Sequence, residues 1–301
     1  MTIYSEKNYD IKSLTSFKIG GEIKEVFFPK DLNEFEQVLR ENKDIQVFGN
    51  LSNTLISSDG YNGKIVLTTN MDSVKINGTK VIADAGVKGP KLAQEVCEKG
   101  LSGFEFMIGF PGSIGGEVCM NASAKGQSVS DFLTVVTCYS PEKGIIKISK
   151  DEMDFQYRYS RCMNENLIVL QAEFELEQKT KNEVQNQMNE NLLFRKLHQP
   201  LLSLPNCGSI FKNPQGDSAG RLAEAVGVKG LTYGGAKIWE GHANFIVNYK
   251  SANSLDVLEL MNTIYTKVKE RYNIELEPEI RFLGGNNKRE NEICKILYKT
   301  K

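Results

Sequence analysis

The segment from Pro205 to Pro214 places a hydroxyl, a lysine and an amide in one short loop. It reads Pro-Asn-Cys-Gly-Ser-Ile-Phe-Lys-Asn-Pro. Proline opposes helix at both ends, so we expect a loop that is fixed at its ends and holds side chains in one orientation. Gly208 supplies backbone freedom directly before Ser209, which favours a ligand-handling role for that hydroxyl. An ordinary turn with a solvated Ser209 is the alternative, and the loop sequence alone leaves both open.

Glycine and proline crowd a second stretch, from Gly109 to Gly116, which reads Gly-Phe-Pro-Gly-Ser-Ile-Gly-Gly. Apolar residues flank it on both sides, whereas a solvent-exposed linker would be polar. We therefore expect its backbone to lie in the interior, close to a flat or phosphorylated ligand. A tight buried crossing of two structural elements is the alternative.

A weaker signal lies at Gly49–Asn53, where a predicted strand leads into glycine, two amides and a hydroxyl. Such a loop can present backbone N–H groups to a phosphate. It matches neither a Walker loop nor a Gly-x-Gly-x-x-Gly turn, so taken alone it does not identify a nucleotide site.

Composition and charge exclude several classes of function. The chain has 301 residues, 40% hydrophobic and 25% charged, and its formal net charge of −1 gives no overall attraction to nucleic acid or acidic lipid. Its six cysteines include no Cys-x-x-Cys pair and it has only two histidines, which predicts reduced thiols and no zinc site. The N-terminus lacks a signal-peptide core and no apolar run approaches membrane-spanning length, so we expect a cytoplasmic protein.

Hydrophobic periodicity predicts the elements that position these loops. A helix is expected over residues 31–40 with Asp31 as its N-cap, and an Asn77-Gly78 turn predicts a β-hairpin. A short helix and a long helix are expected over residues 218–226 and 253–272. Further elements are predicted as strands over residues 26–28, 45–48, 64–68, 135–138, 144–148, 167–175, 244–248 and 276–284, and as a helix over 91–99.

Seven short motifs follow one another along the chain between residue 13 and residue 284. They read Thr-Ser-Phe-Lys-Ile-Gly-Gly, Gly-Phe-Pro-Gly-Ser-Ile-Gly-Gly, Tyr-Arg-x-Ser, Cys-Gly-Ser-Ile-Phe-Lys-Asn-Pro, Ala-Gly, His-Ala-Asn-Phe-Ile-Val-Asn and Leu-Glu-Pro-Glu-Ile-Arg. In this order they resemble the motifs of the UDP-N-acetylenolpyruvoylglucosamine reductases of bacterial cell-wall synthesis. The short spacing between Arg158 and Ser209 resembles the subclass that lacks an extra tyrosine-bearing substrate loop. So many motifs in one order make coincidence negligible.

The resemblance implies an α+β fold with an FAD-binding domain of the vanillyl-alcohol-oxidase (PCMH) type. That domain is expected in two lobes, residues 1–65 and 66–178, followed by a C-terminal α+β substrate domain over 179–285. The charged tail, residues 286–301, is expected to be loose. The resemblance also implies non-covalent FAD, NADPH as co-substrate, and reduction of UDP-N-acetylglucosamine enolpyruvate to UDP-N-acetylmuramate for peptidoglycan synthesis. We expect a monomer or weak dimer, without nucleic acid, membrane or metal partners.

By position in these motifs, the resemblance implies three catalytic residues. Ser209 corresponds to the proton donor to C2 of the enolpyruvyl group, and Arg158 and Glu279 to the pair that stabilises the anionic intermediate. Arginine keeps its charge at working pH, whereas Glu279 would help most if protonated. A surface pair or strand-edge charges is the alternative for Arg158 and Glu279.

The resemblance also implies residues that hold the two ligands. Substrate-binding positions are Tyr157, Lys212, Asn213 and His242. FAD-binding positions lie in the glycine-bearing segments, and these are Gly49, Asn50, Leu51, Ser52, Asn53, Gly109, Pro111, Gly112, Ser113, Gly115, Gly116 and Ala122.

Four positions depart from the family pattern. Leu51 replaces a glycine of the flavin loop, where a side chain crowds a phosphate or forces a different backbone angle. Ser123 and Lys125 stand where glycine and tyrosine are common, and Trp239 where serine is common. These changes leave two alternatives, a divergent FAD oxidase or dehydrogenase of another sugar or alcohol, and a flavin-binding paralogue without turnover. Retention of the three implied catalytic residues argues against the paralogue.

Overall fold

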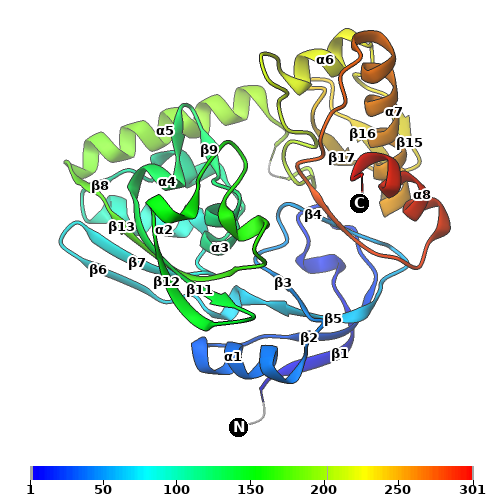
Figure 1. Ribbon diagram of the computed structural model, residues 1–301. Helices are drawn as coiled ribbons and strands as arrows, with labels where there is room; N and C mark the ends of the chain where they lie inside the picture. The colour runs from blue at the N-terminus through cyan, green and yellow to red at the C-terminus, as the bar shows by residue number, and fades with distance from the viewer. Residues whose placement is uncertain (1–2, 202, 300–301) are drawn as a thin grey trace. The chain divides into compact units, whose positions relative to one another are not determined.

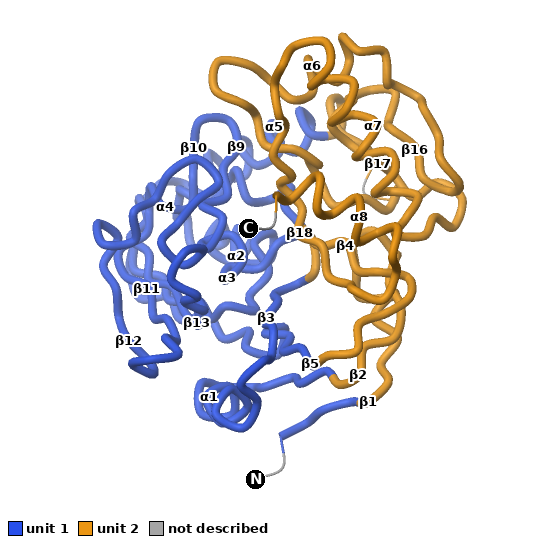
Figure 2. Tube along the Cα trace, turned by 45° about the vertical axis from the view of Figure 1, so that its right-hand side comes forward, with its two compact units in different colours: residues 1–6, 26–50, 64–195 blue, residues 7–25, 51–63, 196–301 orange. Residues whose placement is uncertain are grey.

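The computed structural model describes residues 3–201 and 203–299 and contains two compact units (Figure 2). The first unit comprises the chain up to residue 6 with residues 26–50 and 64–195, and the second comprises residues 7–25, 51–63 and the chain from 196 onward. The second unit includes two N-terminal segments, which pack in its core with the C-terminal part of the chain. The division into two flavin lobes and a substrate domain stays a prediction.

An antiparallel sheet of order β12-β11-β13-β7-β6 forms the centre of the first unit (Figure 1). Its strands are β6 (Val74–Asn77), β7 (Lys80–Asp84), β11 (Leu133–Ser140), β12 (Gly144–Ser149) and β13 (Ile168–Glu175). In β6–β7, Asn77 pairs with Lys80 and Gly78 has a φ of 59°, so the predicted hairpin is confirmed.

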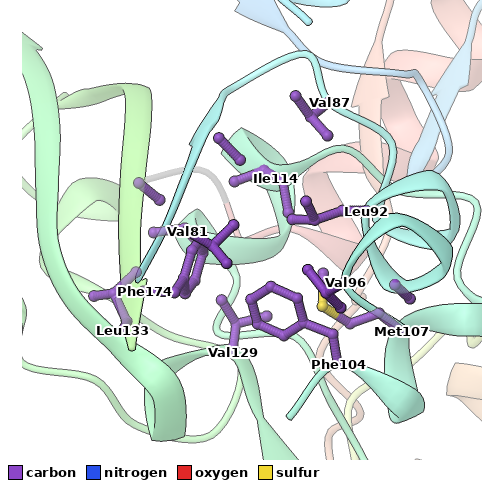
Figure 3. Packing of buried hydrophobic residues seen from close by; sticks show 14 of the residues in the cluster. Val81, Val87, Leu92, Val96, Phe104, Met107, Ile114, Val129, Leu133 and Phe174 are labelled. Atoms are coloured by element: carbon purple, nitrogen blue, oxygen red, sulfur yellow. The ribbon is translucent and has the colours of Figure 1, made fainter. Parts of the chain in front are cut away.

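Helices α2 (Gly89–Glu98) and α3 (Ile114–Cys119) pack against this sheet through its main hydrophobic core. Figure 3 shows Leu92 of α2 beside Ile114 of α3, with Val81 of β7 on the sheet side. All three side chains are fully buried, and burying such a residue contributes about 1.5–3 kcal/mol. This core holds the start of α3 in place.

Helix α1 (Leu32–Glu41) packs through Phe35 and Val38 in a separate buried cluster of the first unit, which includes Leu170 of β13. The side chain of Asp31 accepts hydrogen bonds from two N–H groups of the first turn, both 2.9 Å long. The predicted helix and its N-cap are therefore confirmed.

Helix α5 (Lys181–His198) begins after the sheet and belongs to the first unit as far as Arg195. Val184 and Met188, one turn apart, are its buried residues.

The second unit contains a small antiparallel sheet, a parallel strand pair and three helices. The sheet has order β15-β16-β17, and β18 pairs in parallel with β4. These elements are β4 (Thr54–Ile56), α6 (Ala219–Ala225), β15 (Thr232–Tyr233), β16 (Ala236–Ile238), β17 (Ile246–Asn248), α7 (Ser254–Tyr272), β18 (Arg281–Leu283) and α8 (Lys288–Leu297). Asn253 caps α7 through a capping box, as its predicted N-terminus requires.

The C-terminal tail was predicted to be loose, and that prediction is wrong. Residues 288–297 form α8, in which Ile293 and Leu297 are buried in the core of the second unit. Glu290 is 1% exposed and accepts hydrogen bonds from the hydroxyls of Ser57 and Ser254. The charges suggested a solvated segment, but the two apolar residues one turn apart and the buried Glu290 anchor it.

Most of the remaining elements are short, and three longer strands, β1, β2 and β5, contain residues of both units. They are β1 (Ser5–Asp10), η1 (Lys12–Leu14), β2 (Glu22–Phe27), β3 (Gln46–Phe48), β5 (Tyr61–Leu67), η2 (Thr68–Asn70), β8 (Leu101–Ser102), η3 (Glu105–Gly109), β9 (Ser123–Ala124), β10 (Gln127–Ser128), α4 (Val129–Phe132), η4 (Asp151–Met153), η5 (Arg161–Met163) and β14 (Glu177–Gln178). Within residues 3–201 and 203–299, no helix is long and apolar enough to cross a membrane.

Candidate active site

The two glycine-bearing loops meet in the first unit. The Asn50 side-chain amide donates a hydrogen bond to the Pro111 carbonyl over 2.7 Å, although 61 positions separate them in sequence. A Cβ on Gly49 would overlap the Ser113 hydroxyl, so only glycine permits this approach. Residues that the sequence predicted to hold FAD are thus brought together.

Glycines of the second loop fall into two groups. A Cβ on Gly112 would lie 2.7 Å from Oε1 of Glu117, and one on Gly115 would lie 2.9 Å from Cβ of Ala85. Gly116 is exposed and has open space around its Cα. The first two therefore allow close packing, whereas Gly116 leaves backbone accessible to a ligand.

The polar groups at this junction fit a nucleotide cofactor. Ser113 is 2% exposed, and its hydroxyl has no hydrogen-bond partner among the described residues. Leaving a buried hydroxyl unsatisfied costs about 1–3 kcal/mol, which a phosphate or ring oxygen would relieve. Ala122, also predicted in the FAD set, follows α3 and donates its N–H to the Glu117 carbonyl (2.8 Å).

Leu51 keeps the conformation that glycine favours at its position. Its φ is 51°, in the left-handed region, and its side chain is 3% exposed. The left-handed angle costs about 1–2 kcal/mol for a residue with a Cβ, and burial of the leucine side chain offsets that cost. Leucine therefore takes a left-handed backbone angle in the predicted flavin loop.

Arg158 lies at the tip of a tight turn in the first unit. Gln156 and Tyr159 exchange backbone hydrogen bonds of 3.1 and 3.2 Å below it, and the φ of Arg158 is 52°. The guanidinium donates through Nη1 to Oγ of Ser123 (2.8 Å) and lies 5.1 Å from the centre of the Tyr157 ring. These contacts hold the guanidinium in one orientation.

Three other residues that the sequence singled out, one in a family motif and two that depart from the family pattern, also have defined contacts in the first unit. Ser160, which is fully buried, donates its hydroxyl hydrogen to the Cys119 carbonyl over 2.7 Å and anchors the turn to the end of α3. Ser123, a departure from the family pattern, supplies the acceptor for Arg158. The ammonium of Lys125, another departure, lies 4.6 Å from the centre of the Phe194 ring.

Ser209 lies in a loop of the second unit, as predicted, and its neighbours set the shape of that loop. The Asn206 side chain accepts a hydrogen bond from the N–H of Gly208 (3.0 Å), whose φ is 83°. The Pro205 carbonyl accepts from the N–H of Asn248 (2.9 Å), which fixes the start of the loop. Ser209 itself is half-buried.

The backbone that follows Ser209 pairs with the segment that carries Glu279. The Glu279 N–H donates to the Ile210 carbonyl (2.8 Å), and the Asn53 side chain donates to the Glu279 carbonyl (2.9 Å). Ser209 and Glu279, far apart in sequence, therefore lie on neighbouring backbone segments. Ser52, beside Asn53 in the predicted FAD loop, is half-buried.

The predicted substrate-binding residues of the second unit all have defined contacts. Lys212 Nζ lies 2.6 Å from Oε1 of Glu277, and Asn213 accepts a hydrogen bond from the first N–H of α6 (3.0 Å). His242 packs against Gly220, where a Cβ would lie 2.5 Å from its ring. Burial lowers the pKa of His242, so the imidazole is neutral near pH 7 and offers a hydrogen bond rather than a charge.

Sequence reasoning missed Asn244, which locks the Ser209 loop. Asn244 is 3% exposed, accepts from the Phe211 N–H (3.0 Å) and donates to the Phe211 carbonyl (2.8 Å). Its place between His242 and Phe245 in a recognised motif was the available signal.

Comparisons with known proteins identify the family. Residues 199–283 match the model for the UDP-N-acetylenolpyruvoylglucosamine reductase C-terminal domain, and residues 23–149 match an FAD binding domain. The chain is 38% identical over 284 residues to the UDP-N-acetylenolpyruvoylglucosamine reductase of Caldicellulosiruptor saccharolyticus, which covers 92% of this chain and 91% of that protein. The chain belongs to the UDP-N-acetylenolpyruvoylglucosamine reductase family.

Other members of this reductase family agree in length and fold. The reductase of Enterococcus faecalis is 37% identical over 278 residues, which is 91% of this chain and 92% of that protein. The crystal structure of the reductase from Thermus caldophilus matches with a TM-score of 0.80 and 32% identity, covering 94% of this chain and all of the other. The predicted family, α+β fold class, FAD and oxidoreductase activity are therefore confirmed. The reductase chain shows no cluster of three metal-ligating side chains among its described residues.

Proposed function

We propose that this reductase converts the enolpyruvyl ether of UDP-N-acetylglucosamine to UDP-N-acetylmuramate in the cytoplasm, with NADPH as the electron source. Bound FAD supplies the two-electron carrier between the nicotinamide and the enolpyruvyl group. The observation that supports this assignment most directly is the pairing of the Ser209 segment with the Glu279 segment, including the 2.8 Å bond from Glu279 to Ile210. It places a hydroxyl and a carboxyl group on adjacent backbone.

Ser209 acts as the proton donor to C2. Reduction at C3 leaves negative charge at C2 that the neighbouring substrate carboxylate delocalises, so carbon must then be protonated. A positioned donor contributes about 10²–10⁴-fold in rate. Gly208 and Asn206 hold the loop that presents the hydroxyl, and Asn244 fixes the residues that follow it.

Arg158 stabilises the anionic intermediate together with Glu279. Its guanidinium keeps its charge at working pH and matches a carboxylate geometrically. The bond to Ser123 and the contact with Tyr157 orient it before substrate arrives, which reduces the ordering cost during the reaction. Lys212, Asn213 and His242 are proposed to contact the substrate.

FAD is expected to be held non-covalently. Neither histidine lies in the Gly49–Asn53 or Gly109–Gly116 loops, and His242 packs against Gly220 instead. The purified protein should be yellow, and acid denaturation should release the flavin into the supernatant. Colour that stays with the precipitate would show a covalent link and favour the oxidase alternative.

One anaerobic stopped-flow experiment tests the proposed reaction against both alternatives. NADPH should bleach the flavin absorbance, and addition of UDP-N-acetylglucosamine enolpyruvate should restore it rapidly. Fast recovery with oxygen and none with the enolpyruvyl nucleotide would instead indicate an oxidase. Absence of bleaching in protein that holds FAD would indicate a binding protein without turnover.

A further inference from the structure

The carboxyl group of Glu117 is buried in the first unit without a hydrogen-bond partner. Glu117 is 4% exposed, and neither of its side-chain oxygens is bonded among the described residues. Buried polar groups in native proteins are nearly always satisfied, and a buried carboxyl without a partner is rarer still. The missing partner therefore calls for an explanation.

Glu117 lies one turn after Ser113, the residue that directly precedes α3. The Glu117 N–H donates to the Ser113 carbonyl (2.9 Å), so the two side chains are one helical turn apart. Both are buried, and both lack partners within the described residues. The Ser113 hydroxyl lies beside Gly49 and the Glu117 carboxyl group beside Gly112, so each unsatisfied group adjoins a glycine predicted to bind FAD.

Glycines surround the carboxyl group of Glu117. A Cβ on Gly89 would overlap Oε1, and one on Gly112 would lie 2.7 Å from the same atom. These two glycines are joined by a backbone hydrogen bond of 3.2 Å from the Gly89 N–H to the Gly112 carbonyl. The chain thus keeps side chains away from the carboxyl group instead of providing a bond to it.

Among the described residues, no cation offsets the effect of burial on the Glu117 carboxyl group. Burial raises the pKa of Glu117 to about 8, with no contribution from a charged side chain. Charged residues near this turn include Lys88, whose backbone bridges Ser113 and whose side chain is exposed, and Arg195, which adjoins Gly109. The elements packed against α3, and α2, whose first residue Gly89 lies beside the carboxyl group, carry others that do not contribute to the pKa of Glu117 either, and these include Lys80, Asp84, Lys91, Asp131, Arg161, Glu173 and Glu175. Glu117 is therefore largely a neutral acid at pH 7, and a neutral acid can donate a hydrogen bond.

We propose that Glu117 acts as a neutral carboxylic acid that donates a hydrogen bond to an oxygen of bound FAD, beside the hydroxyl of Ser113. An ionised carboxylate at the same place would repel the anionic cofactor and could not donate. Glu117 is a cofactor-binding residue that depends on its proton. The proposal rests on FAD binding alone and is independent of the substrate assigned above.

The test is FAD affinity of the apoprotein as a function of pH, measured by quenching of flavin fluorescence. For the wild type, Kd should rise about tenfold between pH 7 and pH 9, because FAD then binds only the protonated fraction. Glu117→Gln keeps the shape and a donor but does not titrate, so its Kd should match the wild type at pH 7 and stay nearly constant. Titration of FAD or of other groups is common to both proteins and cancels in the comparison.

Calorimetry gives a second readout that does not depend on affinity. At pH 8.5, in buffers of different ionisation enthalpy, wild-type apoprotein should take up about 0.75 proton more per FAD bound than Glu117→Gln, because about three-quarters of a group with a pKa of about 8 is ionised there. Glu142→Gln, which changes an exposed carboxyl group in the β11–β12 turn, is the matched control and should behave as the wild type. Equal proton uptake by wild type and Glu117→Gln, or parallel pH profiles of Kd, would overturn the proposal.

Discussion

Ser209→Ala is expected to slow flavin reoxidation by the enolpyruvyl substrate by at least about 10²-fold, while flavin reduction by NADPH stays near the wild-type rate. The reason is that Ser209 acts only after reduction at C3, when C2 requires a proton. Its loop is fixed by Pro205 and Asn244, so removal of the hydroxyl should leave the fold intact. Separate anaerobic half-reactions in a stopped-flow instrument measure both rates.

Two further variants sharpen this prediction. Ser209→Cys should partly restore reoxidation because a thiol can also donate a proton, and Ser203→Ala, an exposed serine upstream of the loop, is the matched control with no expected change. Near wild-type reoxidation in Ser209→Ala would show that Ser209 is not the acid. A water molecule held by Glu279 would then be the better candidate.

Glu117→Gln is expected to stabilise the apoprotein progressively as pH rises from about 4.5 to about 8. Burial raises the pKa of Glu117 from 4.5 to about 8, so between these values the folded state keeps a proton that the unfolded state has lost. In the wild type, the contribution of Glu117 to the free energy of unfolding is fully present below pH 4.5 and is lost as the pH rises through 8. The difference in the free energy of unfolding between Glu117→Gln and the wild type should grow by about 1.4 kcal/mol per pH unit, to about 4 kcal/mol at pH 8.

Urea unfolding of both apoproteins at pH 5, 6.5 and 8 measures this difference. The advantage of Glu117→Gln should be small at pH 5 and largest at pH 8, whereas Glu142→Gln should show no such trend because its carboxyl group is exposed in both states. A pH-independent difference would mean that the Glu117 carboxyl titrates normally. That outcome would also remove the basis for a proton-dependent FAD contact.

Local sequence determined several elements because their signals lie within a few residues. Asp31 and Asn253 cap α1 and α7 with side chains that bond to the next turn. Asn77-Gly78 turns the β6–β7 hairpin because glycine accepts a positive φ there. Ordered motifs determined the family for the same reason, since each motif is contiguous in the chain.

Local patterns were less reliable at boundaries and in the tail. The strand predicted over residues 276–284 is reduced to β18, and Pro278 before it forms only an isolated bridge with Phe211. The tail from residue 286 was misjudged because its charge dominates its composition, while Ile293 and Leu297 bury only after the chain folds.

Only the tertiary structure decided how the candidate site is assembled. Asn50 reaches Pro111 across 61 positions, and the Asn53 side chain bonds to the Glu279 backbone across 226. Such pairings depend on which surfaces are buried together, and nothing in the neighbouring residues encodes them. Glu117 is the clearest case, because nothing in its local sequence predicts a buried carboxyl group without a partner. Burial beside Gly89 and Gly112 raises its pKa to about 8 and leaves both carboxyl oxygens unbonded among the described residues.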